Sequence, residues 1–285
     1  MEKLNIPALR QELNEAVAKY AVKPAPAIGM VTDHQINDTI RLRIYRNNST
    51  DQQLPAFIYL HGGGWVRGSI DTHDYLCRHM AQNGAFTVIA VDYRLAPEYS
   101  YPAPVEDGCL ALNWIREHAS DIAVDVHRLA IGGDSVGGNI AIALTAQATA
   151  QAIPIKALVV AYSPVNYNFH TVSYEKYATG HGLTTHLMKR FWEVYIPSPE
   201  DRQLPSASVI FNDFTGFPPT LIIGTDQDPL HDDGKQLLLR LTDAGVDTRY
   251  SFYAGTKHAF LLRLAFEEKA LLAQEEIVNF LKQRL

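Results

Sequence analysis

Short apolar segments alternate along this chain with longer segments of helical periodicity, and that alternation restricts the fold more than any other feature. It is typical of α/β proteins, in which helices cover both faces of a largely parallel sheet. The expected strands are residues 27–33, 39–45, 55–61, 87–93, 128–133, 156–162, 219–225 and 248–254. The expected helices are about 73–83, 104–119, 137–150, 232–245 and 262–284, after an amphipathic helix within 1–20.

Two segments depart from a uniform pattern. Residues 39–45 alternate apolar and polar side chains near the N-terminus, so we expect an antiparallel strand at an edge of the sheet. Residues 165–215 separate two core strands by more than a usual connection and mix aromatic side chains with prolines. We interpret this second segment as an inserted cap or lid.

Composition and charge argue against several classes of function for this chain. The 285 residues carry a formal net charge of -6 and no basic run, so no nucleic-acid partner is expected. No apolar run approaches the ~20 residues of a membrane span, and no signal peptide is visible, so no membrane association is expected. Cys77 and Cys109 lack metal or redox spacing and are interpreted as buried apolar residues, which favours a reducing cytoplasm. The histidines of residues 71–80 also lack ligand spacing, so no metal or other cofactor is expected.

A serine lies among four glycines in the stretch GGDSVGG, residues 132–138. An apolar strand precedes it and a helical segment follows, which is the context of a nucleophile elbow that lifts a serine hydroxyl above the sheet. Gly133 and Gly137 occupy the positions where side chains would collide. Because a glycine-rich turn could also cradle a phosphate, a nucleophilic role for Ser135 needs further residues in support.

Donors for a developing oxyanion are available in the stretch HGGGW, residues 61–65, at the end of a predicted strand. The N–H groups of Gly63 and Gly64, together with that of Val136 after the serine, are the candidate oxyanion donors. His61 is interpreted as a residue that orients this loop by hydrogen bonding.

An acid and a base follow later strands. Asp226 and Asp228 end the seventh predicted strand, and His258 follows the eighth. Doubly wound sheets build their sites at such carboxyl ends of strands. The chain order Ser135, Asp228, His258 is that of the α/β-hydrolases.

Several stretches together resemble the hormone-sensitive-lipase-like branch of the α/β-hydrolases, a group of bacterial carboxylesterases with an HGGG loop. They are HGGGW (61–65), VDYRLAPEYSYPAPVEDG (91–108), GGDSVGGN (132–139), GFPPTLIIGTDQDPLHDDG (216–234) and LTDAGVDTRYSFYAGTKHAF (241–260), in the family's order. The resemblance implies one α/β-hydrolase domain over residues 1–285, with a mostly parallel eight-stranded sheet flanked by helices. It also implies a small helical cap formed by residues 1–25 and 165–215.

The resemblance implies a catalytic triad of Ser135, Asp228 and His258, with Asp226 in a structural role. Val136 stands where the family usually has alanine, so we expect its side chain to narrow the pocket beside the oxyanion site. The N-terminal segment is short for the family, which implies a reduced cap and an open pocket.

Aromatic residues are the candidates for the wall of the substrate pocket. We expect Trp65, Phe191, Trp192 and Tyr195 to line it. Plain packing within the cap is the alternative for the three residues of the stretch 189–197.

The combined pattern predicts a carboxylesterase that hydrolyses short-chain acyl esters of small molecules through an acyl-enzyme. Amide or formamide hydrolysis, as by an arylformamidase, is an alternative on the same triad. A non-catalytic binding protein is another, similar to the plant hormone receptors of this branch, but those receptors lack the base that His258 supplies here. The oligomeric state stays open, with a homodimer among the alternatives.

Overall fold

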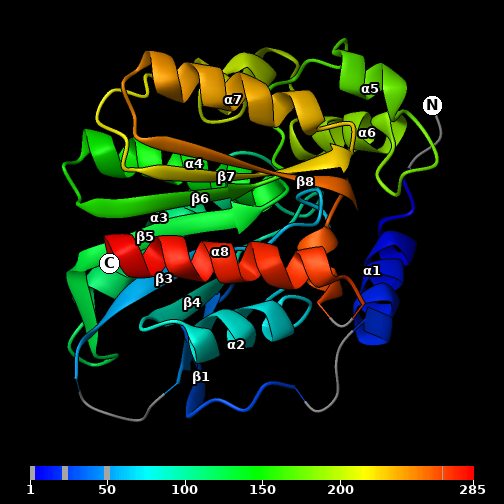
Figure 1. Cartoon of the computed structure of the whole chain (residues 1–285). Coiled ribbons are helices and arrows are strands. Elements are labelled where there is room, and N and C mark those ends of the chain that lie inside the picture. The colour runs from blue at the N-terminus through cyan, green and yellow to red at the C-terminus, as the bar shows by residue number, and fades with distance from the viewer. Residues whose placement is uncertain (1–3, 21–24, 48–51, 265) are drawn as a thin grey trace.

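The computed structural model describes residues 4–20, 25–47, 52–264 and 266–285. An eight-stranded sheet with the order β1-β2-β4-β3-β5-β6-β7-β8 forms its centre (Figure 1). The strands are β1 (Met30–Gln35), β2 (Arg41–Arg46), β3 (Leu54–Leu60), β4 (Thr87–Asp92), β5 (Val124–Asp134), β6 (Ile155–Ala161), β7 (Thr220–Gln227) and β8 (Thr248–Lys257). Each of them overlaps a strand predicted from the sequence, and the predicted α/β class is confirmed.

The α-helices are α1 (Ile6–Tyr20), α2 (Asp74–Asn83), α3 (Ala103–Glu117), α4 (Val136–Ala150), α5 (Val172–Lys176), α6 (Thr185–Tyr195), α7 (His231–Asp243) and α8 (Glu268–Arg284). Short 3-10 turns are η1 (Glu200–Gln203), η2 (Val209–Phe211) and η3 (Phe260–Arg263). The helix expected over 262–284 is therefore divided into η3 and α8. Among the described residues, no helix combines the length and the apolar character needed to cross a membrane.

The strand pairing corrects one expectation about the edge of the sheet. β2 is antiparallel to both of its neighbours, as predicted, but β1 pairs with its outer side and forms the edge. The alternation in β2 has another cause than an edge position. Leu42 and Ile44 are fully buried, whereas Arg41 and Arg43 alternate with them and pair with Asp33 of β1. All other neighbouring strands are parallel.

Two hydrophobic cores cover the two faces of the sheet. α2 and α8 pack on one face around Phe57, and α3, α4 and α7 pack on the other around Ile58 (Figure 1). The central strands are buried on both sides, which explains their continuous apolar sequences. Cys77 is buried between α2 and the sheet, as expected, but Cys109 is partly exposed, with its Sγ 3.0 Å from Gln147 Oε1.

The carboxyl ends of the parallel strands point to the side of the molecule that holds α1, α5 and α6 (Figure 1). Residues 165–215 contain α5, α6, η1 and η2. Arg10 connects α1 to the segments that follow β3 and β4. Its Nε donates to Val66 O at 2.8 Å, and its Nη2 lies 2.7 Å from a Glu98 carboxylate oxygen. Of the predicted N-terminal cap segment, residues 1–3 and 21–24 lie outside the described residues.

Candidate active site

Ser135 occupies the turn between β5 and α4 in a conformation that L-residues rarely adopt, with φ 51° and ψ -126°. Such a conformation costs of order 1–3 kcal/mol and persists only where the surroundings impose it. Here β3 imposes it. A Cβ atom on Gly133 would lie 2.4 Å from Leu60 O, and one on Gly137 would lie 2.0 Å from the same oxygen. Both positions therefore require glycine because a side chain would collide there, as inferred from the sequence.

A continuous chain of hydrogen bonds links the serine, the histidine and an aspartate. His258 Nε2 lies 2.9 Å from Ser135 Oγ, and His258 Nδ1 lies 2.7 Å from Asp228 Oδ2. Asp228 is fully buried, and it also accepts hydrogen bonds from Thr225 Oγ1 and from Leu230 N. Because the ionised carboxylate can only accept, it favours a proton on Nδ1 and leaves Nε2 free to accept the serine proton.

Asp226 has different partners. Its Oδ2 accepts from Gly255 N at 2.8 Å, and its Oδ1 lies 3.4 Å from the Tyr177 hydroxyl. These contacts join the end of β7 to β8 and to the segment after α5. They support the structural role expected for Asp226 beside Asp228.

The oxyanion loop, residues 61–65, places backbone N–H groups beside the serine. Gly63 has φ 135° and Gly64 has φ 70°, and a Cβ on Gly63 would lie 2.0 Å from Arg67 O. The N–H groups of Gly63, Gly64 and Val136 have no acceptor within the part of the chain that the structure describes. At Val136 this follows from its place at the start of α4, where the first N–H groups have no partner in the helix. The loop thus offers donors that an anionic oxygen could use.

A buried carboxylate, which the sequence analysis missed, anchors this loop. Asp134 Oδ1 accepts from Gly62 N at 2.8 Å and from the Tyr59 hydroxyl at 2.6 Å, and it lies 3.2 Å from His73 Nε2. Burial alone would raise the pKa of Asp134, but His73 and the two donors outweigh it and hold the pKa at about 2. The sequence does contain a signal for Asp134, because an acidic side chain directly before the serine, at the end of a buried strand, requires polar partners.

His61 orients the loop, as the sequence suggested. Its Nδ1 lies 2.8 Å from Gly62 O, and its ring stacks on Tyr93 with 4.2 Å between ring centres. Burial, together with the nearby His73, lowers the pKa of His61 to about 4. His61 is therefore neutral near pH 7, and the cavity beside Ser135 does not include it.

A family model described as the alpha/beta hydrolase fold matches residues 57–262. The chain belongs to the α/β-hydrolase family. The hydrolase is 33% identical to the ethyl acetate hydrolase of Pseudomonas putida over 281 residues, which are 96% of this chain and 88% of that protein. It is 34% identical to the carboxylesterase NlhH of Mycobacterium tuberculosis over 227 residues, or 78% and 71% of the two chains. The structure of the Pyrobaculum calidifontis esterase superposes with a TM-score of 0.94 at 34% identity, covering 98% of this chain and 93% of that one.

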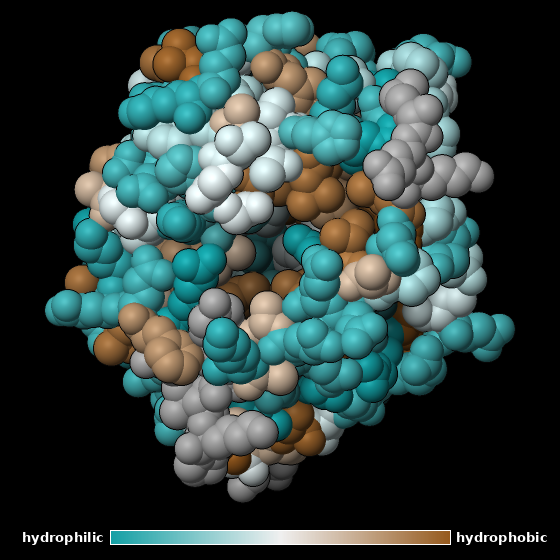
Figure 2. Space-filling model, turned by 90° about the vertical axis from the view of Figure 1, so that its right-hand side faces the viewer, coloured by the Kyte–Doolittle hydropathy of each residue, from teal (hydrophilic) through white to brown (hydrophobic). Residues whose placement is uncertain are grey.

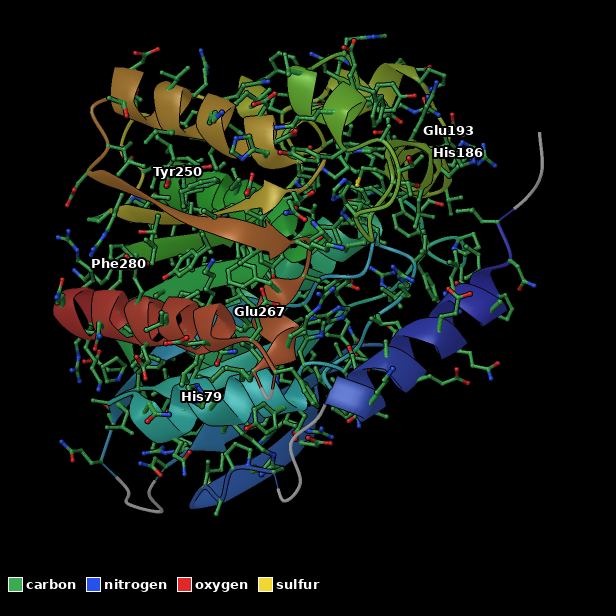
Figure 3. All side chains as sticks on the ribbon, turned by 45° about the vertical axis from the view of Figure 1, so that its right-hand side comes forward. His79, His186, Glu193, Tyr250, Glu267 and Phe280 are labelled. Atoms are coloured by element: carbon green, nitrogen blue, oxygen red, sulfur yellow. The ribbon has the colours of Figure 1, made fainter. Side chains whose placement is uncertain are left out.

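A cavity of about 360 Å³ opens beside Ser135 and His258 in the hydrolase. The face that carries α1 and residues 165–215 is hollowed, and apolar residues border part of the hollow (Figure 2). α1 contributes Leu13, Ala16 and Val17 to the wall, and α6 contributes Met188 and Phe191. The other side of α6 carries His186 and Glu193, which lie at the outside of the molecule (Figure 3).

Three of the four aromatic residues expected in the pocket wall lie behind it. Trp65, Trp192 and Tyr195 are fully buried, whereas Phe191 lines the cavity. The Trp65 ring stacks on Tyr195 with 4.4 Å between centres and meets Trp192 at 4.8 Å. Because these rings bury each other's faces, the structure favours the packing alternative for Trp192 and Tyr195 and corrects the expectation for Trp65.

Val136 also differs from its expected position. Its side chain is fully buried in the core, away from the residues that line the cavity. The expectation that it narrows the pocket is therefore wrong. The cause is the direction of the first turn of α4, which turns the side chain into the core.

Proposed function

We propose that the hydrolase is a carboxylesterase that hydrolyses short-chain acyl esters of small molecules. The observation that carries this proposal is the hydrogen-bonded chain Asp228–His258–Ser135 at the wall of a cavity. A serine hydroxyl is a weak nucleophile unless a base accepts its proton, and this chain supplies such a base in the right tautomer.

The reaction begins with transfer of the Ser135 proton to His258 Nε2 as Oγ attacks the ester carbonyl carbon. The carbonyl oxygen becomes an anion and is stabilised by the N–H groups of Gly63, Gly64 and Val136. The tetrahedral intermediate collapses to an acyl-enzyme, and His258 gives its proton to the departing alcohol. Water then attacks the acyl group while His258 accepts its proton, and His258 returns that proton to Ser135 Oγ as the bond to the acyl group breaks and the free acid leaves.

The size of the cavity supports short substrates. Its volume of about 360 Å³ is near the lower end of the range of roughly 300–1,000 Å³ for ligand pockets. Helix α1 and the segment 165–215 form the wall on the outer side, and we assign them to a cap on a single domain of residues 1–285. We expect the highest kcat/KM for acetyl to butyryl esters and no activation at an oil–water interface.

The test is a series of p-nitrophenyl esters from acetyl to palmitoyl, measured on the wild type and on Ser135→Ala. Turnover should be greatest for short chains, and Ser135→Ala should retain only the ~10³ to 10⁴-fold acceleration over water that oxyanion contacts give. Substantial turnover by Ser135→Ala would exclude Ser135 as the nucleophile. An optimum at ten carbons or longer would contradict the short-chain assignment.

Hydrolysis of amides or formamides remains an alternative on the same groups, which a side-by-side assay of a p-nitrophenyl ester and N-formylaniline distinguishes. A homodimer also remains a prediction, which sedimentation velocity would test.

A further inference from the structure

One cation on the cavity wall has no carboxylate partner among the described residues. Arg67 follows the oxyanion loop and lines the same cavity as Ser135. Its Nη1 makes one long hydrogen bond, 3.4 Å, to Leu9 O, while its Nε is buried without a partner among the described residues. Its Cζ lies 5.4 Å from the centre of the Phe191 ring.

Two other arginines close to this end of the sheet are paired with carboxylates. Arg10 contacts Glu98 at 2.7 Å, and Arg94 contacts Asp107 at 2.6 Å. No described carboxylate oxygen lies within 4.0 Å of Arg67. A partly buried guanidinium with an unused donor is costly, because its lost hydration is not replaced. Nε is closed to solvent, so an anionic ligand in the cavity would be bound by the terminal nitrogens of the guanidinium, of which Nη1 makes only the long bond to Leu9 O.

The other charged groups on the wall leave this role to Arg67. Glu12 of α1 is exposed to solvent, and Arg263 has Glu267 at 4.0 Å. The remaining charged group, the carboxylate of Asp134, already interacts with Gly62, Tyr59 and His73. Burial lowers the pKa of Arg67, with Glu12 opposing the effect, but a guanidinium stays charged at neutral pH. Its planar fork matches the two oxygens of a carboxylate.

We propose that Arg67 makes the hydrolase selective for esters that carry a second, free carboxylate, which Arg67 binds while the ester carbonyl lies at Ser135. The proposal rests on the esterase function above and adds the substrate class. The carboxylate can belong to the acyl part, as in a half-ester of a dicarboxylic acid, or to the alcohol part, as in an O-acetylated hydroxy acid. Both present the same anion to the guanidinium.

The test compares each charged ester with a neutral ester of nearly the same shape, in which a carboxamide replaces the free carboxylate. Monoethyl succinate against ethyl succinamate tests the acyl part, and 3-acetoxypropanoate against 3-acetoxypropanamide tests the alcohol part. kcat/KM is measured for the wild type, Arg67→Met and Arg67→Lys. Arg128→Met is the matched control, because Arg128 pairs with Asp125 at the start of β5 and does not line the cavity.

In at least one pair, the wild type and Arg128→Met should prefer the carboxylate by about 10- to 100-fold, as a charge-assisted hydrogen bond provides. Arg67→Met should lose this preference, mainly through a higher KM for the charged esters. It should still hydrolyse the ester bond of the two neutral substrates that carry an amide. Arg67→Lys should keep part of it, because the charge remains without the fork. The pair that responds identifies the part of the substrate that Arg67 binds.

Equal kcat/KM within both pairs in the wild type would overturn the proposal, and would leave the esterase function intact. An equal loss on charged and neutral substrates in Arg67→Met would also overturn it, since Arg67 would then act on the oxyanion loop itself. Absence of turnover of every ester by the wild type would instead overturn the esterase function, and the substrate class with it.

Discussion

The two sides of the cavity are built in different ways. On the sheet side, backbone atoms touch backbone atoms: a Cβ on Gly137 would lie 2.0 Å from Leu60 O. On the cap side, α1 and α6 form the wall with side chains, and a Cβ on Gly182 would meet no atom of the described residues within 4 Å. The sheet side therefore fixes the positions of the reacting groups and tolerates little change. We expect the cap side to decide which substrates fit, and single substitutions there to change the range of substrates.

The largest difference is expected between the two aspartates at the end of β7. Asp228→Asn should lower kcat by about 10⁴-fold, because an amide no longer enforces the productive tautomer of His258. Asp226→Asn should leave kcat within a few-fold and reduce mainly stability, since its partners are Gly255 N and the Tyr177 hydroxyl. Steady-state kinetics and urea unfolding of both variants measure this contrast. The reverse ranking would move the catalytic acid to Asp226.

A second contrast compares glycines on the two sides. Gly137→Ala should lower the free energy of unfolding by at least about 3 kcal/mol, because Leu60 O belongs to a central strand and cannot move away. Gly182→Ala should cost only about 1 kcal/mol, for its φ of 94°, because the space around it is open. Urea unfolding followed by circular dichroism gives both values. Equal losses would show that the two sides are equally rigid.

The sheet side should also make the stability sensitive to acid. The pKa of His61 is about 4 in the folded state, below the ~6.5 of an unperturbed histidine, so the unfolded chain binds the proton first as the pH falls. Stability should therefore decrease from pH 6.5 to 4, by up to about 3 kcal/mol from this group. Asp134, with a pKa of about 2, loses its contribution only below pH 4. In His61→Asn the decrease between pH 6.5 and 4 should be smaller. An identical pH dependence of urea unfolding in both proteins would argue against this role.

The smallest effect is expected from the cap side. Phe191→Ala should move the optimum of the p-nitrophenyl ester series toward longer acyl chains, with a gain of about 3- to 10-fold for hexanoyl and octanoyl esters. Val136→Ala is the control: its side chain lies in the core, so it should lower stability and leave the optimum unchanged. If the optimum moved in Val136→Ala but not in Phe191→Ala, Val136 and not Phe191 would limit the length of the acyl chain.

The same contrast explains what the sequence could predict. The strands, the elbow and the order Ser135, Asp228, His258 follow from local patterns, because strand periodicity and a glycine-flanked turn depend on neighbouring residues. The burial of Trp65 and the direction of Val136 depend on how α6 and α4 pack, which no local pattern contains.

The pair formed by Asp134 and His73 was missed for a related reason. These residues come from different elements and meet only in the folded sheet. Likewise, Arg67 is one of many arginines in the sequence, and only the structure distinguishes it by its missing partner.

The position of α1 has a consequence for how the enzyme is made. α1 is synthesised well before η3, whose Leu262 and Arg263 share the cavity wall with Leu13 and Val17. A nascent chain that has not reached residue 258 contains Ser135 and the oxyanion loop, but it lacks His258, the proposed base. Helix α1 can therefore complete the wall of the cavity only after the chain from β8 to η3 has been made and has folded against it.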